Sequence, residues 1–269
     1  MPEGDTVWNT ARALHDAVAG TTIVRSQFRV PQLATADVAG WTIDESAARG
    51  KHLLLRLRRP DGRAVTLHSH LRMDGAWRTF RAGERWRGPS HTIRVVLETE
   101  TVTAVGYHLH EIALVPTDEE DRLVGFLGPD LLGDDWDATT AVMNLRSKPE
   151  RAIVDALLDQ RNLAGVGNMY KSEVLFLRGV WPWRPVTDVP DLPALVDLVQ
   201  QMMAAHRGRW RQSTTGSLRP GEEFYVYGRP NRPCRRCGTL IRRADNTDNE
   251  RVTFWCPTCQ PEHEGSRSA

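Results

Sequence analysis

The segment CRRCGTLIRRADNTDNERVTFWCPTC, residues 234–259, holds all four cysteines of the chain in two CxxC pairs. Eighteen residues separate the pairs, a spacing typical of structural zinc sites. Four thiolates complete the coordination shell of one Zn2+ ion, so we expect a metal that organises the fold and does no chemistry. The intervening residues predict two strands around a polar turn, and a redox pair or unrelated buried thiols is the alternative. The predicted zinc ligands are Cys234, Cys237, Cys256 and Cys259.

Arginine is concentrated just before and within this segment. The 269-residue chain has a formal net charge of only +1, yet residues 206–243 contain ten arginines and two acids, Glu222 and Glu223. A surface this basic fits the phosphates of a nucleic acid. A solvated basic loop is the alternative.

A glycine-containing turn, LAGVGNMYKSE at residues 163–173, joins two helical patterns upstream of the cysteines. Gly165 and Gly167 allow backbone conformations with positive φ, and Asn168 is placed to cap the helix that follows. Backbone N–H groups at the start of a helix bind anions, so this turn is a candidate phosphate site. A plain helical hairpin with a glycine turn is the alternative.

The N-terminal half predicts one helix followed by short strands. Residues 5–20 place apolar side chains on one side of a helix that ends at Gly20, so Pro2 and Glu3 stand at its entrance. Many short strands separated by Gly, Pro and Asp turns predict a sandwich or a barrel. These strand patterns occupy residues 21–28, 51–58, 64–71, 92–99 and 101–109.

After Pro116 the pattern changes to helices, which the sequence places at residues 149–161, 168–179 and 192–210. The last residues, PEHEGSRSA, have the composition of a disordered tail. We therefore predict an α+β multidomain chain with four parts. These are an N-terminal helix with a β-sandwich (1–117), a helical domain with its linker (118–222), a zinc-finger β-hairpin (223–261) and the tail (262–269).

The amino terminus is a candidate nucleophile. Initiator methionine is normally removed before a small residue, which leaves the secondary amine of Pro2 at the start of the chain. Attack of this amine on a sugar carbon at the aldehyde level gives an iminium ion, which withdraws electrons and allows β-elimination of a phosphate. The pKa of a model α-amino group is about 7.7 to 8.0, and the positive end of a helix favours the neutral amine further. Glu3 is then an acid/base partner, with simple helix capping as the alternative.

Lysine is scarce, since Lys51, Lys148 and Lys171 are the three lysines among 35 Lys and Arg residues. A lysine can give up its proton inside a protein and an arginine cannot, so each lysine is a candidate for proton transfer. Survival by chance on the surface is the alternative.

The sequence predicts no membrane association. Its apolar runs are shorter than the roughly 18 residues of a membrane helix, and its start does not resemble an export signal. We expect a cytoplasmic protein, in which reduced cysteines favour a metal site over disulfides.

Five motifs together resemble the formamidopyrimidine-DNA glycosylase and endonuclease VIII family over essentially the whole chain. The start Pro-Glu-Gly-Asp is similar to the endonuclease VIII branch, since the formamidopyrimidine branch more usually reads Pro-Glu-Leu-Pro. The resemblance implies a helix-two-turn-helix in the helical domain and DNA bound between the halves of the protein. The motifs are MPEGDTVW at 1–8, RGKHLLL at 49–55, SHLRMDGAW at 69–77, LAGVGNMYKSEVLF at 163–176 and the cysteine segment ending in FWCPTCQ.

The resemblance also implies roles for individual residues. Pro2 would be the Schiff-base nucleophile, and Glu3 the general acid/base in base loss and sugar-ring opening. Lys51 would contact phosphate and donate a proton during β-elimination. Asn168 would hold the DNA backbone at the lesion together with Arg251, which looks like the finger arginine linked to δ-elimination.

A damaged base must leave the stack before a nucleophile can reach C1′, and a side chain must fill the gap. Met73, flanked by Arg72, lies at the expected strand turn, and a flexible thioether suits insertion between bases. Core packing is the alternative for Met73. Lys171 is also placed in the predicted DNA-binding set. The endonuclease VIII loop usually carries Gln-Leu-Tyr, whereas Arg72-Met73-Asp74 is closer to the other branch.

We therefore expect a bifunctional DNA glycosylase and abasic-site lyase that repairs damaged double-stranded DNA by base excision. It would act as a monomer in the bacterial cytoplasm, at the nucleoid, with one structural zinc and no redox or nucleotide cofactor. The expected reaction removes an oxidised base, with pyrimidines favoured, and nicks the strand by β,δ-elimination. The alternatives are the same chemistry on oxidised purines such as 8-oxoguanine, and a zinc-finger protein that binds DNA without cutting it.

Overall fold

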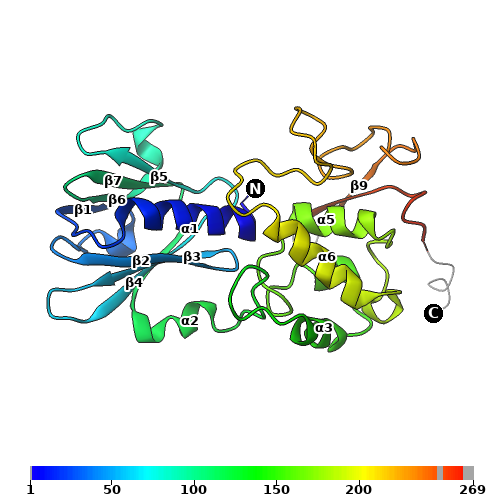
Figure 1. Cartoon of the computed structure of the whole chain (residues 1–269), viewed down its shortest axis with the longest axis horizontal. Coiled ribbons are helices and arrows are strands. Elements are labelled where there is room, and N and C mark those ends of the chain that lie inside the picture. The colour runs from blue at the N-terminus through cyan, green and yellow to red at the C-terminus, as the bar shows by residue number, and fades with distance from the viewer. Residues whose placement is uncertain (1, 247–250, 263–269) are drawn as a thin grey trace. The chain divides into compact units, whose positions relative to one another are not determined.

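The computed structural model describes residues 2–246 and 251–262, with the backbone alone described at Asn246 and Arg251. The chain forms two compact units, Met1–Phe126 and Leu127–Ala269, here called the N-terminal and C-terminal units (Figure 1). The predicted α+β multidomain class is confirmed. The finer boundaries at residues 117, 222 and 261 stay predictions. Within the described ranges, no helix combines the length and the apolar composition needed to span a membrane.

The N-terminal unit is a β-sandwich with one long helix, α1 (Gly4–Val18). Its strands are β1 (Arg25–Phe28), β2 (Thr42–Arg49), β3 (His52–Arg58), β4 (Ala64–His70), β5 (Ala76–Arg81), β6 (Ile93–Glu98), β7 (Val102–Tyr107) and β8 (Glu111–Pro116). Short helices η1 (Pro31–Leu33), η2 (Ser90–Thr92), η3 (Thr117–Glu119) and α2 (Asp121–Val124) complete it. One sheet has the order β1-β6-β7-β5 and the other β2-β3-β4-β8, with antiparallel neighbours throughout.

The core of this unit follows the two sequence periodicities. Val7 and Leu14 lie on one face of α1 at helical spacing. Leu53, Leu55 and Leu57 lie on one face of β3 at period two. All five are at most 1% exposed. Because side chains from α1 and from both sheets share this core, the helix is fixed against the strands, along which Figure 1 shows it running.

The C-terminal unit is helical and carries a β-hairpin on its central helix. Its elements are α3 (Ala138–Arg146), α4 (Ile153–Ala156), α5 (Asn168–Leu177), η4 (Val186–Asp188), α6 (Leu192–Ala204), β9 (Arg242–Asn246) and β10 (Arg251–Trp255). The α5 helix is buried along nearly its whole length, with α6 and β10 packed against it. Phe176 of α5 shares a core with Phe254 of β10 and with Cys256. The predicted turn between the two hairpin strands, 247–250, and most of the predicted tail, 263–269, lie outside the described residues.

Candidate active site and nucleic-acid interface

Glu3 stands at the start of α1 and is fully buried. Its backbone carbonyl accepts a hydrogen bond from the N–H of Val7 at 3.0 Å, as an N-cap residue does. Pro2 is half-buried and directly precedes it. The predicted helix entrance is therefore present, and the positive end of the helix lies beside the residue predicted as the nucleophile.

The direction of α1 brings these residues to one end of the second sheet. The N–H of Gly20 donates to the carbonyl of Ile43 at 2.7 Å, and the N–H of Ser46 donates to Nδ1 of His15 at 3.4 Å. The helix therefore runs antiparallel to β2. From His15 back to Glu3 it rises about 18 Å, and from Ser46 to the turn after β2 the strand extends about 15 Å. The start of α1 and that turn lie at the same end of the sheet (Figure 1).

Lys51 lies in the turn at this end. Arg49 pairs with His52 in the β2–β3 register, which leaves Gly50 and Lys51 as a two-residue turn. Gly50 has a φ of 57°, the left-handed conformation that tight hairpin turns need and that glycine adopts without strain. The structure thereby places a half-buried lysine at the end of the sheet where α1 begins.

Three histidines beside Lys51 form a cluster that sequence reasoning missed. Nδ1 of His52 lies 2.8 Å from Nε2 of His68, the two rings are stacked, and His70 meets the His52 ring edge-on. Burial, and after it the charge of His68, lowers the pKa of His52 to about 4. Burial also lowers the pKa of His68. A sequence signal was available, because His68 and His70 stand two residues apart and so share a face of β4.

His70 has a defined tautomer. Its Nδ1 accepts a hydrogen bond from the backbone N–H of Arg72 at 3.0 Å. Burial, and after it the charge of His52, lowers the pKa of His70 to about 3. A neutral imidazole that accepts at Nδ1 carries its proton at Nε2. His70 therefore offers one N–H donor at this end of the sheet.

The loop after β4 presents Arg72 and Met73 at the same end, because the β3–β4 register pairs His70 with His52, which directly follows Lys51. Arg72 has a φ of 51°, in the left-handed region, and its guanidinium forms an ion pair with Glu111. The side chain of Met73 is 66% exposed. Core packing is therefore the wrong interpretation of Met73. Its exposed apolar side chain stands on a loop that the ion pair of Arg72 with Glu111 restrains, and such a side chain suits insertion between bases.

Asn168 is the first residue of α5 and not its cap. Gly167 holds the N-cap position with an extended φ of −121°, so the prediction that Asn168 caps this helix is wrong. Of the two glycines, only Gly165 has a positive φ angle, which is 110°. Because the backbone of Asn168 is already helical, its side chain is not directed at the N–H groups of the first turn. Its Oδ1 is buried and has no hydrogen-bond partner among the described residues, which leaves one acceptor of the side chain without a donor.

Lys171, predicted to bind DNA, is fully buried. Its Nζ donates to the hydroxyl of Thr253 at 3.0 Å and to the carbonyl of Val252 at 3.3 Å. Both acceptors belong to β10, whose first residue is Arg251. A side chain enclosed in this way does not face solvent, so the structure contradicts the predicted contact with DNA. Lys171 instead joins α5 to the strand that begins at Arg251, whose own side chain is outside the described part.

A second buried group on α5, Glu173, was not predicted. Its carboxylate accepts hydrogen bonds from the backbone N–H groups of Val226 and Tyr227, both at 2.8 Å, and of Tyr225 at 2.9 Å. The hydroxyl of Thr214 also donates to it. A buried carboxylate needs several donors, and an acid within an apolar helical run was the available sequence signal. Glu173 fastens the segment before the first CxxC pair to α5.

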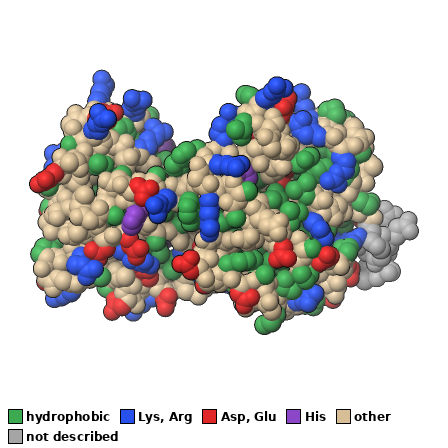
Figure 2. Space-filling view, in the orientation of Figure 1, with side chains coloured by type: hydrophobic (Ala, Val, Ile, Leu, Met, Phe, Trp, Pro, Cys, Tyr) green, Lys and Arg blue, Asp and Glu red, His purple; other side chains and the backbone are tan. Residues whose placement is uncertain are grey.

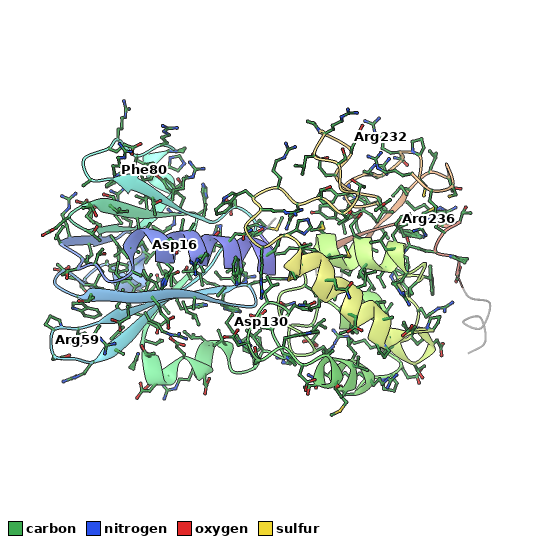
Figure 3. All side chains as sticks on the ribbon, in the orientation of Figure 1. Asp16, Arg59, Phe80, Asp130, Arg232 and Arg236 are labelled. Atoms are coloured by element: carbon green, nitrogen blue, oxygen red, sulfur yellow. The ribbon has the colours of Figure 1, made fainter. Side chains whose placement is uncertain are left out.

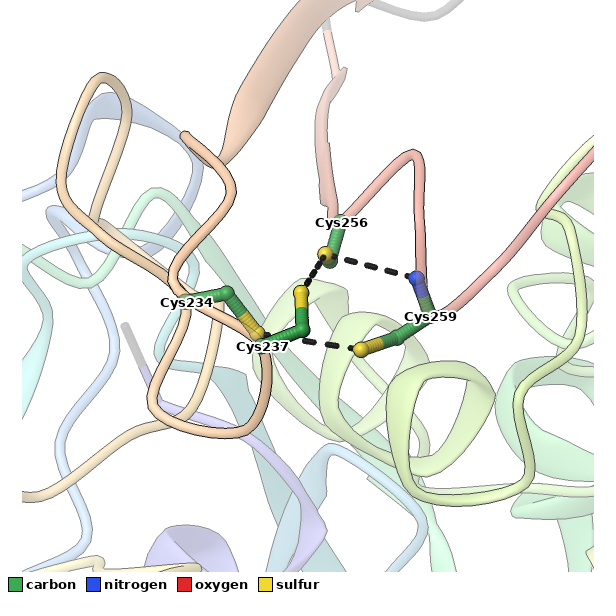
Figure 4. A group of neighbouring side chains, drawn as sticks. All are labelled: Cys234, Cys237, Cys256 and Cys259. Atoms are coloured by element: carbon green, nitrogen blue, oxygen red, sulfur yellow. Dashed lines mark hydrogen bonds between the residues drawn. The ribbon is translucent and has the colours of Figure 1, made fainter.

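The four cysteines converge on one point (Figure 4). Sγ of Cys234 lies 3.9 Å from Sγ of Cys259. Sγ of Cys237 lies 3.5 Å from Sγ of Cys256, and all four sulfurs lie within 4.8 Å of one another. Zn–S bonds of about 2.3 Å in a tetrahedron separate the sulfurs by about 3.8 Å. The cysteines therefore fit one structural zinc ion, as predicted.

Several arginines near the cysteines contact the protein itself. Arg235 donates to the carbonyls of Phe224 at 3.0 Å and Gly221 at 2.6 Å. Arg236, labelled in Figure 3, lies over an aromatic ring of α5 at 4.6 Å from the ring centre. These contacts shape the finger and reduce the number of its arginines that are available to phosphates. On the face drawn in Figure 2, basic and acidic side chains are interspersed, in keeping with the net charge of +1.

Three family models match successive parts of the chain. The formamidopyrimidine-DNA glycosylase N-terminal domain matches residues 1–110, the formamidopyrimidine-DNA glycosylase H2TH domain 127–205, and the zinc finger found in FPG and IleRS 232–261. The chain belongs to the formamidopyrimidine-DNA glycosylase and endonuclease VIII family. The resemblance inferred from the five motifs is confirmed, and so is the zinc finger.

Relatives named endonuclease 8 match nearly the full length. The chain is 56% identical over 265 residues to the probable endonuclease 8 2 of Streptomyces coelicolor, which covers 97% of this chain and 94% of that protein. It is 45% identical over 260 residues to the DNA-(apurinic or apyrimidinic site) lyase Nei2 of Mycolicibacterium smegmatis, with 97% and 99% covered. These names agree with the predicted endonuclease VIII branch. The Lactococcus lactis Fpg in complex with abasic-site DNA has a TM-score of 0.79 at 25% identity, over 97% of this chain and all of that one.

Proposed function

We propose that this protein is a bifunctional DNA glycosylase and abasic-site lyase of base excision repair, with the amine of Pro2 as its nucleophile. The observation that carries the proposal is the arrangement at one end of the N-terminal unit. There Pro2 and the buried Glu3 stand directly before α1, the adjoining turn holds Lys51, and the next loop exposes Met73. A nucleophile, an acid, a cation and a wedge are the groups that excision of a flipped base requires.

In the first step the neutral amine of Pro2 attacks C1′ of the damaged nucleotide. The bond from nitrogen to C1′ forms as the bond to the base breaks, and the base leaves with the bonding electron pair and takes up a proton from Glu3. Glu3 then takes the proton of the attacking amine and donates it to the ring oxygen, which opens the sugar and converts the adduct to an iminium ion. The burial of Glu3 shields this transfer from bulk water.

Elimination follows from the charge of the iminium ion. Loss of the acidified C2′ proton and cleavage of the C3′–O bond release the 3′ phosphate, and Lys51 contacts this phosphate and supplies a proton. A second elimination releases the 5′ phosphate. We assign the contact with this phosphate to Arg251. Hydrolysis of the remaining iminium ion restores the amine of Pro2.

The DNA is held by residues of each unit in this proposal. Asn168 binds a backbone phosphate at the start of α5 by donating from the NH2 group of its side chain. Met73 fills the gap left by the flipped base, with Arg72 beside it. Because phosphate contacts dominate, binding falls steeply as salt rises. We assign a monomer acting on duplex DNA in the bacterial cytoplasm.

We propose oxidised pyrimidines as the preferred lesions, because the start Pro-Glu-Gly-Asp and the names of the relatives agree on the endonuclease VIII branch. One observation favours oxidised purines instead, namely that the exposed wedge residue is Met73 and not Gln-Leu-Tyr. Excision from duplexes with thymine glycol and with 8-oxoguanine, measured side by side, separates the two. A strong preference for the purine rejects the pyrimidine assignment.

Borohydride trapping on an abasic-site duplex tests the nucleophile, because it reduces an iminium ion to a stable amine. We expect a covalent protein–DNA band in the wild type and none in Pro2→Gln, in which the bulky second residue causes Met1 to be retained. Pro60→Thr changes an exposed proline of the same unit and should keep the band. No band in the wild type, with DNA binding intact, would support a zinc-finger protein without catalysis.

A further inference from the structure

Asp74 lies between two histidines in the loop that carries Met73. Its Oδ2 is 3.0 Å from Nδ1 of His108, and its Oδ1 is 3.0 Å from Nε2 of His110. The side chains of Asp74, His108 and His110 are 52%, 37% and 54% exposed. The excision chemistry proposed above uses none of these three groups.

The spacing of the three side chains suits a metal ion. Their ligand atoms all lie within 4.8 Å of one another. Transition-metal bonds to imidazole nitrogen and carboxylate oxygen are about 2.0 to 2.2 Å long, which puts adjacent ligand atoms about 3 Å apart in an octahedron and about 3.4 Å apart in a tetrahedron. The nitrogen–oxygen distances of 3.0 Å around Asp74 match the octahedral separation. Two imidazoles and one carboxylate leave further coordination positions open to water.

A second observation comes from the backbone of His108. This residue has a φ of 48°, in the left-handed region that residues with a side chain rarely adopt. Its N–H donates to the carbonyl of Thr92 at 2.8 Å, which holds the strained turn in place. The result is that two histidines two residues apart reach one carboxylate. Strain retained at a defined place indicates a function there.

The charges around this cluster are compatible with a cation. Asp74 contributes a negatively charged carboxylate to the cluster. The nearest cation along the loop, Arg72, is ion-paired with Glu111. Its positive charge is therefore offset close to the cluster.

We propose that Asp74, His108 and His110 bind a divalent transition-metal ion, of the class of Zn2+, Ni2+ or Co2+, in addition to the zinc ion of the four cysteines. Imidazole ligands suit these ions, whereas Mg2+ and Ca2+ prefer sites made of oxygen alone. Because all three side chains are exposed, the ion enters directly from solvent. Water molecules complete its coordination.

A metal ion at this site should also affect the rate of base excision, a consequence that rests on the proposed function. Met73 immediately precedes Asp74, so a hydrated ion on Asp74 stands beside the side chain that would enter the DNA. The ion adds bulk at that point and ties the wedge loop to His108 and His110. Its binding therefore slows excision, and the metal acts as an inhibitor.

Calorimetric titration of zinc-loaded, untagged protein with Ni2+ tests the site without DNA, so a failure here is distinct from a failure of the glycosylase assignment. We expect one ion bound beyond the zinc ion already present. Asp74→Ala, His108→Ala and His110→Ala should each weaken this binding by about tenfold or more. His91→Ala removes an exposed histidine that is not one of the three proposed ligands and should bind Ni2+ like the wild type.

Two results would overturn the proposal. One is the absence of any added ion in the wild type, and the other is equal affinity in the wild type and in His110→Ala. The three altered side chains are exposed, so the variants should fold, and circular dichroism checks this. In the excision assay, saturating Ni2+ should slow the wild type and His91→Ala by the same factor. An unchanged wild-type rate would reject the inhibitory role.

Discussion

Nζ of Lys171 lies 3.0 Å from the hydroxyl oxygen of Thr253 and donates a hydrogen bond to it, which joins the helix that begins at Asn168 to the strand that begins at Arg251. The ammonium group is fully buried, and the carbonyl of Val252 is its second acceptor in β10. Two residues that we propose as DNA contacts therefore stand on elements joined by one buried side chain.

Replacing Lys171 by Met should destabilise the C-terminal unit by about 1–3 kcal/mol, because it leaves buried acceptors without their donor. DNA affinity should also fall, since β10 is then held less firmly against α5. Urea denaturation measures the first effect, and fluorescence anisotropy with an abasic-site duplex measures the second. Lys148→Met alters an exposed lysine of the same unit and should change stability by less than about 0.5 kcal/mol. Wild-type stability and affinity in Lys171→Met would show that this bond does not hold β10.

Sequence reasoning located α1, α5, α6 and the strands with clear periodicity. Of the helix predicted at residues 149–161 only the short α4 is present, and α3 was not predicted. Three strands were also missed, β2, β5 and β8. Each of the three is at the edge of its sheet. Edge strands commonly carry charged side chains, which hide the alternation of apolar and polar residues. In β2 these charges have partners on β3, since Asp44 pairs with Arg58 and Glu45 with Arg56. Such pairs become visible only when the register is known.

The same limit applies to the site. The sequence pointed to Pro2, Glu3 and Lys51 because their chemistry is local or because they stand in a recognisable motif. It could not reveal that His52 stacks on His68, since the contact depends on the pairing of β3 with β4. The burial of Lys171 likewise depends on how β10 packs on α5.

Replacing Cys256 by Ser should remove the zinc ion and disorder the hairpin, because the metal holds the two CxxC pairs together. DNA binding should be lost while the N-terminal unit, whose core is separate, stays folded. Zinc content by atomic absorption and DNA affinity check the two effects, with limited proteolysis reporting on the N-terminal unit. Unchanged zinc content in Cys256→Ser would contradict the assignment of this ligand.

Replacing Glu3 by Gln should slow removal of a damaged base by about 10²–10⁴-fold, the usual contribution of a general acid/base. The lyase step on a preformed abasic site should suffer less, since that substrate has already lost its base. Gel assays with a lesion duplex and with an abasic duplex compare the two steps in one preparation. Asp16→Asn, an exposed acid on the same helix, serves as the control. Equal slowing of both steps would assign Glu3 to elimination and not to base loss.

The histidines beside Lys51 should make the stability of the N-terminal unit depend on pH. Burial lowers the pKa of His52 to about 4 and of His70 to about 3, and the charges of His68, Arg72 and Lys51 act in the same direction. In the unfolded chain these groups titrate near 6.5. Between those values the unfolded state binds protons that the folded state does not, so stability falls as the pH drops from about 6.5 toward 4.

His52→Asn removes one of these groups and should make that pH dependence shallower, by up to about 1.4 kcal/mol per pH unit. Urea denaturation at several pH values between 7.5 and 5 gives the free energy of unfolding at each pH, and hence its slope against pH. Carboxylates that titrate in the same window act equally in both proteins and cancel in the comparison. His91→Asn removes an exposed histidine of the same unit and should keep the wild-type slope. If His52→Asn also keeps that slope, His52 binds its proton at the same pH in the folded and unfolded chain, and burial does not lower its pKa.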